Sequence, residues 1–196
     1  MSARRLARGT RFVLATALSA FLAGAAAAQT LTIGVRAGPE SIDPHFTATG
    51  THAESLKHIF DTLVWSGDQL QLEPRLAESW RPIGPTTWEF RLRRGVRFHD
   101  GSEFTAEDVR FSIGRVPMVS GPNPTTPYIR KVREVRIIDP HTIHIETPGP
   151  SPTLPNDLIR VFIVSHRAAA GPTRGNANEA LNTGRAPIGP GPHPFV

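Results

Sequence analysis

The chain has 196 residues, of which 39% are hydrophobic and 20% are charged, and this composition excludes wholesale disorder. The net charge is +5, but four arginines fall within residues 1–28, which contain no acid, so from Gln29 onward 18 basic residues face 17 acidic ones. This even balance is not that of a nucleic-acid-binding protein, and no nucleic-acid partner is expected.

The N-terminus has the three parts of a secretory signal. An arginine-rich stretch ends at Arg11, an apolar run follows over 12–22, and small residues end at Ala28, which predicts cleavage before Gln29. The alternative is a retained membrane anchor, because the run 12–28 reaches the lower limit of a bilayer span. There is no cysteine, which excludes disulfides, thiol catalysis and a lipidated N-terminal cysteine. We therefore expect a soluble periplasmic protein.

The first expected elements of the mature chain are a strand and a helix. Apolar residues alternate with small or polar ones over 31–35, which predicts a strand, and Gly-Pro and Asp-Pro turns follow within 38–44. Thr51 and Glu54 have the spacing of a capping box, which marks a helix start. The apolar residues that follow have the spacing of one buried face of a helix over 51–64: Leu56, Ile59, Phe60, Leu63 and Val64.

A strand, a turn and a second helix are expected next. Residues 87–93 alternate apolar and polar side chains, which predicts a half-buried strand that continues over 96–98. Asp-Gly at 100–101 predicts a turn, and Thr105 predicts a helix N-cap. The buried faces are expected to contain Trp88, Phe90 and Leu92 from the strand and Val109, Ile113 and Val116 from the helix.

The remaining elements are a hairpin and a short helix. β-Branched residues alternate on both sides of Asp139-Pro140, so residues 132–145 predict an antiparallel hairpin. The apolar run 158–164 follows three prolines at 150, 152 and 155, and we expect a short helix there.

Residues 98–109, FHDGSEFTAEDV, combine a histidine with several acids. In an enzyme, Asp100, Glu107 or Asp108 could act as a general base beside His99. The favoured interpretation is a turn and a helix cap, with Glu107 and Asp108 in the first helical turn, where the helix dipole favours negative charge. No catalytic residue is expected.

The eight histidines raise the question of a metal site. His52 and His58 are six positions apart on the expected helix and would face away from each other. His141 and His144 would lie on opposite faces of a strand. Neither a metal site nor a cofactor is therefore expected.

Four blocks of sequence occur in the order and spacing of one known family. They are LTIGVRAGPESIDPHF (31–46), HIFDTLVWSGDQLQLEPRLAESW (58–80), TWEFRLRRGVRFHDGSEFTAEDVRFSIGR (87–115) and VREVRIIDPHTIHIETPGP (132–150). On these blocks, the third above all, the chain resembles family 5 extracellular solute-binding proteins, the periplasmic dipeptide- and oligopeptide-binding receptors of ABC importers.

The resemblance implies an α/β fold like that of type II periplasmic binding proteins, with two lobes hinged around a ligand and an extra domain inserted near the start of lobe one. After the signal peptide (1–28), residues 29–46 would start lobe one, 47–165 would be mostly the inserted α/β domain, and 166–196 would return to lobe one. The family's Gly-Thr-Gly-Pro-Tyr motif appears as GPGPHPF from Gly189. The fold is expected to be incomplete, with lobe two missing, as in a truncated gene.

The expected ligand-binding residues come from two segments. After Phe46, the segment 46–51 contains only small or polar residues around Gly50, so its backbone N–H and C=O groups could pair with an extended peptide. The alternative is a simple loop before a helix. In the family, the segment after the Asp-Pro motif lines the cleft, which here implies Thr47, Ala48, Thr49, Gly50 and Thr51. Tyr128 resembles a tyrosine that reaches the ligand in oligopeptide receptors, with core packing as the alternative.

The expected function is that of the periplasmic solute-binding component of an ABC importer, without enzymatic activity or a cofactor. The expected partners are a peptide or similar small solute and the permease subunits in the inner membrane, and the protein itself is expected to be a monomer. The alternatives are a non-functional remnant of such a receptor and an exported hydrolase. The sequence does not decide whether the solute is a peptide, glutathione, a nickel chelate or a sugar derivative.

Overall fold

The computed structural model describes Gly34 and residues 41–119, 121–169 and 189–191. The expected signal peptide lies outside the described residues, as does the strand expected at 31–35 apart from Gly34. The chain divides into two compact units, 1–34 and 35–196, and every helix and strand below belongs to the second.

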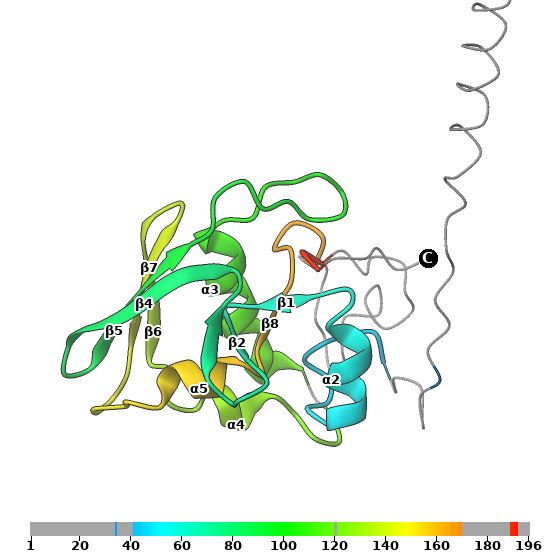
Figure 1. Cartoon of the computed structure of the whole chain (residues 1–196), viewed down its shortest axis with the longest axis horizontal. Coiled ribbons are helices and arrows are strands. Elements are labelled where there is room, and N and C mark those ends of the chain that lie inside the picture. The colour runs from blue at the N-terminus through cyan, green and yellow to red at the C-terminus, as the bar shows by residue number, and fades with distance from the viewer. Residues whose placement is uncertain (1–33, 35–40, 120, 170–188, 192–196) are drawn as a thin grey trace, which may run out of the picture. The chain divides into compact units, whose positions relative to one another are not determined.

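A four-stranded antiparallel sheet forms the largest element of this unit (Figure 1). Its order is β4 (Ala77–Gly84), β5 (Thr87–Leu92), β7 (Thr142–Glu146) and β6 (Glu134–Asp139). The hairpin predicted over 132–145 is confirmed, because Val135 pairs with Ile145 and Ile137 with Ile143. β5 pairs with β7, so two segments far apart in sequence form the middle of the sheet.

The strand predicted over 87–93 is confirmed to Leu92, with Phe90 and Leu92 buried and Arg91 exposed. Its continuation over 96–98 is wrong. Gly95 has a φ of 73°, a left-handed conformation that turns the chain out of the strand. Within residues 96–98, only Arg97 forms a β-bridge, and its partner is Glu103.

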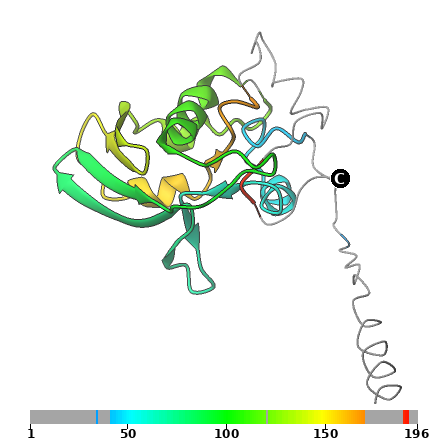
Figure 2. The same ribbon diagram turned by 90° about the horizontal axis from the view of Figure 1, so that it is seen from above.

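Helix α3 (Ala106–Arg115) begins at the predicted N-cap, Thr105. The Asp108 carboxylate accepts the backbone N–H of Thr105 at 2.8 Å, which satisfies a donor that the first helical turn leaves unpaired. The predicted apolar face is buried, with Val109, Ile113 and Val116 each at most 4% exposed. α3 covers one face of the sheet and contacts β6 (Figure 2), and a short 3₁₀-helix, η2 (Val116–Met118), follows it.

The helix predicted over 51–64 is wrong in both of its bounds. Helix α2 runs Gly50–Leu56 with Thr49 at the N-cap position, so Thr51 and Glu54 do not form a capping box. The chain then enters two strands, β1 (Asp61–Thr62) and β2 (Val64–Ser66). β-Branched and aromatic residues favour strands, and here the pairing of β1 with the distant β8 and of β2 with the nearby β3 outweighs the helical spacing. The five apolar residues are nevertheless all buried.

The helix predicted within 158–164 is also wrong. Helix α5 (Leu154–Leu158) begins earlier, with Pro155 in its first turn, where a missing N–H costs no intrahelical hydrogen bond. β8 (Phe162–Ile163) occupies the apolar run and pairs antiparallel with β1. The remaining elements are β3 (Leu72–Pro74), which pairs with β2, and helix α4 (Thr126–Ile129).

The buried side chains form two hydrophobic clusters. The larger, the sheet core, fills the space between the four-stranded sheet, α3 and α5. The smaller, the α2 core, contains Leu56, Ile59, Phe60, Phe162, Val164 and Ala169. Figure 1 shows α2 beside β1 and β8, away from the four-stranded sheet. Residues 189–191 cover the α2 core, where the Gly191 N–H donates to the carbonyl of Ile59 at 2.9 Å.

Candidate functional site

Two segments of the predicted ligand-binding region meet at one hollow, here called the Tyr128 hollow. Its volume is about 340 Å³. Ala48 and Thr49 line it from the start of α2, and the segment around α4 forms the opposite wall. The residues from that segment are Pro122, Asn123, Pro124, Pro127 and Tyr128.

A backbone bridge holds the two walls together. Thr47 and Asn123 form a parallel β-bridge, and the Ala48 N–H donates to the Asn123 carbonyl at 2.7 Å. The walls approach so closely that a Cβ on Gly121 would lie 1.7 Å from the carbonyl oxygen of Phe46. Position 121 therefore requires glycine for space.

The predicted site residues occupy different positions around this hollow. Ala48, Thr49 and Tyr128 line it. Gly50 and Thr51 are exposed in the first turn of α2 but are not lining residues. Thr47 is 1% exposed, and its hydroxyl has no hydrogen-bond partner in the described part of the chain. Tyr128 also packs against the sheet core, as the alternative for this residue expected.

A buried polar cluster lies at the base of the segment that leads to the Tyr128 hollow. Arg115, at the end of α3, forms an ion pair with Asp43 and donates a hydrogen bond to His45 Nδ1 at 2.8 Å. His45 Nε2 donates to the Phe162 carbonyl at 2.8 Å, since Nδ1 is the acceptor of the ring. This cluster ties residues 43–45 to both α3 and β8.

Burial and charge set the protonation of this cluster. Burial and the nearby Arg115 guanidinium lower the pKa of His45 to about 4, so the ring is neutral at pH 7. Burial alone would raise the pKa of Asp43, but hydrogen bonds and charge from Arg115 outweigh it and hold that pKa below its ordinary value. The pair is therefore ionised and the histidine uncharged.

Sequence reasoning missed Asn123 and Arg115. Asn123 acts through its backbone, which no side-chain pattern reveals, although the flanking Pro122 and Pro124 mark an extended segment. Arg115 has the ordinary appearance of a basic residue in the last turn of a helix. Only the fold brings it to Asp43.

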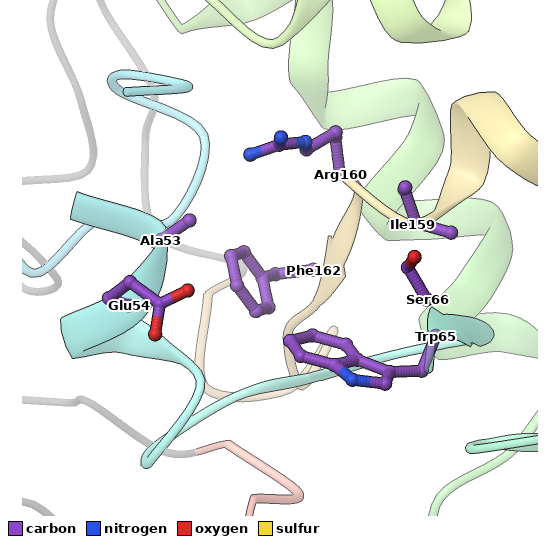
Figure 3. A pocket seen from close by; sticks show the side chains of 7 residues that line it. All are labelled: Ala53, Glu54, Trp65, Ser66, Ile159, Arg160 and Phe162. Atoms are coloured by element: carbon purple, nitrogen blue, oxygen red, sulfur yellow. The ribbon is translucent and has the colours of Figure 1, made fainter. Parts of the chain in front are cut away.

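A second hollow, the Trp65 hollow, lies between the two hydrophobic clusters (Figure 3). Its volume is about 200 Å³. Trp65 and Phe162 supply two aromatic rings, and Glu54 and Arg160 lie on different sides of the opening. The other lining residues are Ala53, Ser66 and Ile159.

The acid-rich motif at 98–109 forms structural contacts. The Asp108 carboxylate, besides capping α3, contacts the backbone N–H and Nδ1 of His166 at 3.0 and 2.8 Å. Asp100 accepts the N–H and the hydroxyl of Ser102 at 2.9 and 2.6 Å. His99 contacts the Gly191 carbonyl through Nε2 at 2.9 Å. These atoms are engaged in a cap, a turn and a contact between segments.

Three further observations concern the described part of the chain. Among residues 41–119, 121–169 and 189–191, no three His, Asp or Glu side chains are grouped as metal ligands. His58 lies beyond the end of α2, so it does not share that helix with His52 as expected. No helix in the described ranges has the length and apolar character needed to cross a membrane.

Comparisons with known proteins agree with the four sequence blocks. The family model described as "Bacterial extracellular solute-binding proteins, family 5 Middle" matches residues 71–196. Over 218 aligned residues, which include all of this chain, it is 30% identical to di/tripeptide-binding protein 2 of Pseudomonas aeruginosa strain UCBPP-PA14. The alignment covers 40% of that protein.

Solved structures of binding proteins have the same fold. NikZ from Campylobacter jejuni in complex with Ni(L-His) superposes with a TM-score of 0.71 at 27% identity, over 85% of this chain and 33% of NikZ. The periplasmic binding protein DppA from Helicobacter pylori, in complex with the peptide STSA, gives a TM-score of 0.66 at 27% identity, over 82% of this chain and 35% of DppA. The chain thus has a mixed α/β periplasmic-binding-protein fold and spans about a third of these structures.

Proposed function

Because the chain belongs to the family 5 bacterial extracellular solute-binding proteins, we propose that it serves as the periplasmic binding component of an ABC importer for peptides or related small solutes. One observation supports this most directly. Ala48 and Thr49, from the segment 47–51, and Tyr128 were assigned to the ligand from sequence, and although they lie about 80 residues apart in the chain they line one hollow whose walls are joined by a backbone bridge.

The chemistry of the Tyr128 hollow suits an extended peptide. Thr49 lines the hollow at the N-cap position of α2, so its N–H has no intrahelical acceptor and can donate to a ligand. Tyr128 offers a half-buried ring and a hydroxyl on the opposite wall. Backbone pairing binds peptides with little regard to their side chains.

The proposed export, domain organisation and delivery to a permease rest on the resemblance to the family. Residues 1–28 would direct export to the periplasm, 29–46 would start lobe one, 47–165 would form most of an inserted domain, and 166–196 would return to lobe one. A complete receptor would close around the solute and deliver it to permease subunits in the inner membrane. The proposed role is binding and delivery rather than catalysis.

The test is a titration of the 196-residue chain with tri-alanine, in which binding is monitored through NMR chemical shifts. Each hydrogen bond to an open, solvated surface contributes about 0.5–1.5 kcal/mol. The ligand's lost freedom costs several kcal/mol, about 4 or more. The expected dissociation constant is therefore about 1 mM or weaker. Shifts should concentrate at the amides of Ala48 and Thr49 and at the Tyr128 ring.

Tyr128→Ala should weaken these shifts, whereas Leu70→Ala, at a position 82% exposed and away from the hollow, should not. Shifts that map to another surface, or none at all, would contradict the proposal and favour a remnant without binding activity. Micromolar affinity would contradict the weak binding expected of this surface.

A further inference from the structure

The Trp65 hollow has the lining of a small-molecule site rather than of a packing defect. Phe162 is 4% exposed and belongs to the α2 core, so its ring is held firmly by its neighbours. Trp65 is only half-buried and faces the opening, where Figure 3 shows its ring below that of Phe162. The hollow therefore offers an aromatic surface that a flat apolar group can cover.

The charges around this surface are predominantly positive. Lys57 Nζ and Arg75 Cζ lie 5.9 and 5.3 Å from the centre of the Trp65 ring. Glu54 is the acidic lining residue, and its carboxylate is already paired with Lys57. The exposed Arg160 guanidinium has no ion-pair partner among the described residues. An anionic group is thus favoured over a cationic one.

We propose that the Trp65 hollow binds a carboxylate attached to a flat apolar group. The apolar group covers Trp65 and Phe162, and the carboxylate accepts hydrogen bonds from the Arg160 guanidinium, whose fork of N–H donors matches two carboxylate oxygens. Glu54, which is paired with Lys57, lies on another side of the opening, so Arg160 is the lining residue that remains available to the anion. This site goes beyond the proposed function, since it requires neither a second lobe nor the Tyr128 hollow.

Two sources could supply such a group: a free aromatic acid, or the C-terminal residue of a peptide. The two hollows are neighbours along α2, because Thr49 lines one and Ala53 the other. Four residues of helix separate them by about 6 Å along the axis. A short peptide could therefore reach from one hollow to the other.

The experiment follows the indole N–H resonance of Trp65 in the ¹⁵N-labelled 196-residue chain, assigned with Trp65→Phe. The probes are 3-phenylpropionate, its neutral amide and phenethylamine. We expect a saturable shift with the acid alone. Arg160→Gln should weaken it about fivefold, the range of a surface ion pair. Arg110→Gln removes a similarly exposed arginine on α3 that pairs with Glu107, and it should leave the affinity unchanged.

The source is identified with Gly-Gly-Phe and its C-terminal amide. A shift by Gly-Gly-Phe that the amide does not reproduce would assign a peptide source, and one by 3-phenylpropionate alone would assign a free acid. An equal response to acid and neutral amide, a stronger response to phenethylamine, or no response from any carboxylate would overturn the proposal. These outcomes do not depend on whether tri-alanine binds at the Tyr128 hollow.

Discussion

Asp43 and Arg115 form a two-point ion pair in the interior of the protein, although 72 positions separate them in the chain. Their side chains are 0% and 2% exposed. Arg115 Nη1 donates to Asp43 Oδ1 at 2.9 Å, and Nη2 donates to Oδ2. The pair attaches the segment that leads to the Tyr128 hollow to the end of α3.

Removal of one partner of this pair should be strongly destabilising. Arg115→Met leaves the Asp43 carboxylate buried without its cation, and we expect a loss of about 3–5 kcal/mol in the free energy of unfolding. The double variant Asp43→Asn, Arg115→Met should lose less than Arg115→Met alone, because no uncompensated charge remains. Urea denaturation measures both. Equal losses would show that the ion pair contributes little beyond packing.

Stability should fall on mild acidification because of His45. The unfolded chain binds a proton near the ordinary histidine pKa of about 6.5, whereas the folded protein resists it until about pH 4. The free energy of unfolding should therefore decrease as the pH falls from about 6.5 to 4, by about 3 kcal/mol. The lowered pKa of Asp43 adds a second loss at lower pH, as that carboxylate protonates. His45→Gln should flatten the first decline, and a profile unchanged by it would contradict this assignment.

Two glycines should respond in opposite ways to alanine. Gly121→Ala places a Cβ against the Phe46 carbonyl and should cost about 1–3 kcal/mol while disrupting the Thr47–Asn123 bridge. Gly114 lies in α3, where a Cβ would meet nothing within 4 Å, so Gly114→Ala should stabilise by about 0.5–1 kcal/mol. Thermal melts of both variants provide the comparison. A tolerated Gly121→Ala would mean that the two walls of the Tyr128 hollow can separate.

Phe60 fills the centre of the α2 core. It is 0% exposed, so Phe60→Ala should cost about 3–5 kcal/mol through lost burial and the cavity left behind. Leu70, at 82% exposed, provides the matched control, and Leu70→Ala should change stability by less than about 0.5 kcal/mol. Denaturant melts that gave Phe60→Ala a loss below about 1 kcal/mol would show that this cluster does not support the fold.

Export should yield a mature protein that begins at Gln29. The arginine-rich, apolar and small-residue parts of 1–28 follow the order of a cleavable signal. N-terminal sequencing of the protein recovered from the periplasmic fraction of the expressing cells checks this. Protein with an intact Met1 in the membrane fraction would favour the retained anchor.

The sequence predicted best the elements that depend on neighbouring residues. The hairpin over β6 and β7 and the helix that begins after Thr105 both have a local turn or cap together with a regular apolar spacing. Apolar spacing also identified the buried residues of 56–64, but it could not decide their conformation. There, the two-residue strand β1 forms because β8 lies alongside, about 100 positions later in the chain.

The Tyr128 hollow was predictable only in part, because some of its lining comes from contacts between segments that are distant in the sequence. Ala48, Thr49 and Tyr128, which line it, are among the residues that the resemblance to the family indicated. Asn123 contributes a carbonyl, which every residue has, and its importance arises only from the bridge to Thr47. The Trp65 hollow is composed from α2, β2, β8 and the segment between α5 and β8, and no single stretch of sequence contains its pattern.

The pairing of β1 with β8 makes the intervening hundred residues a closed loop, with Asp61 beside Ile163 at its base. The entropy cost of closing a flexible loop grows with the logarithm of its length, so that even doubling the length adds only about 0.6 kcal/mol. A few residues added at the turn between β2 and β3, within 67–71, would therefore barely affect closure. We expect changes in length among homologous chains to accumulate inside this loop, while its two-residue base keeps its register.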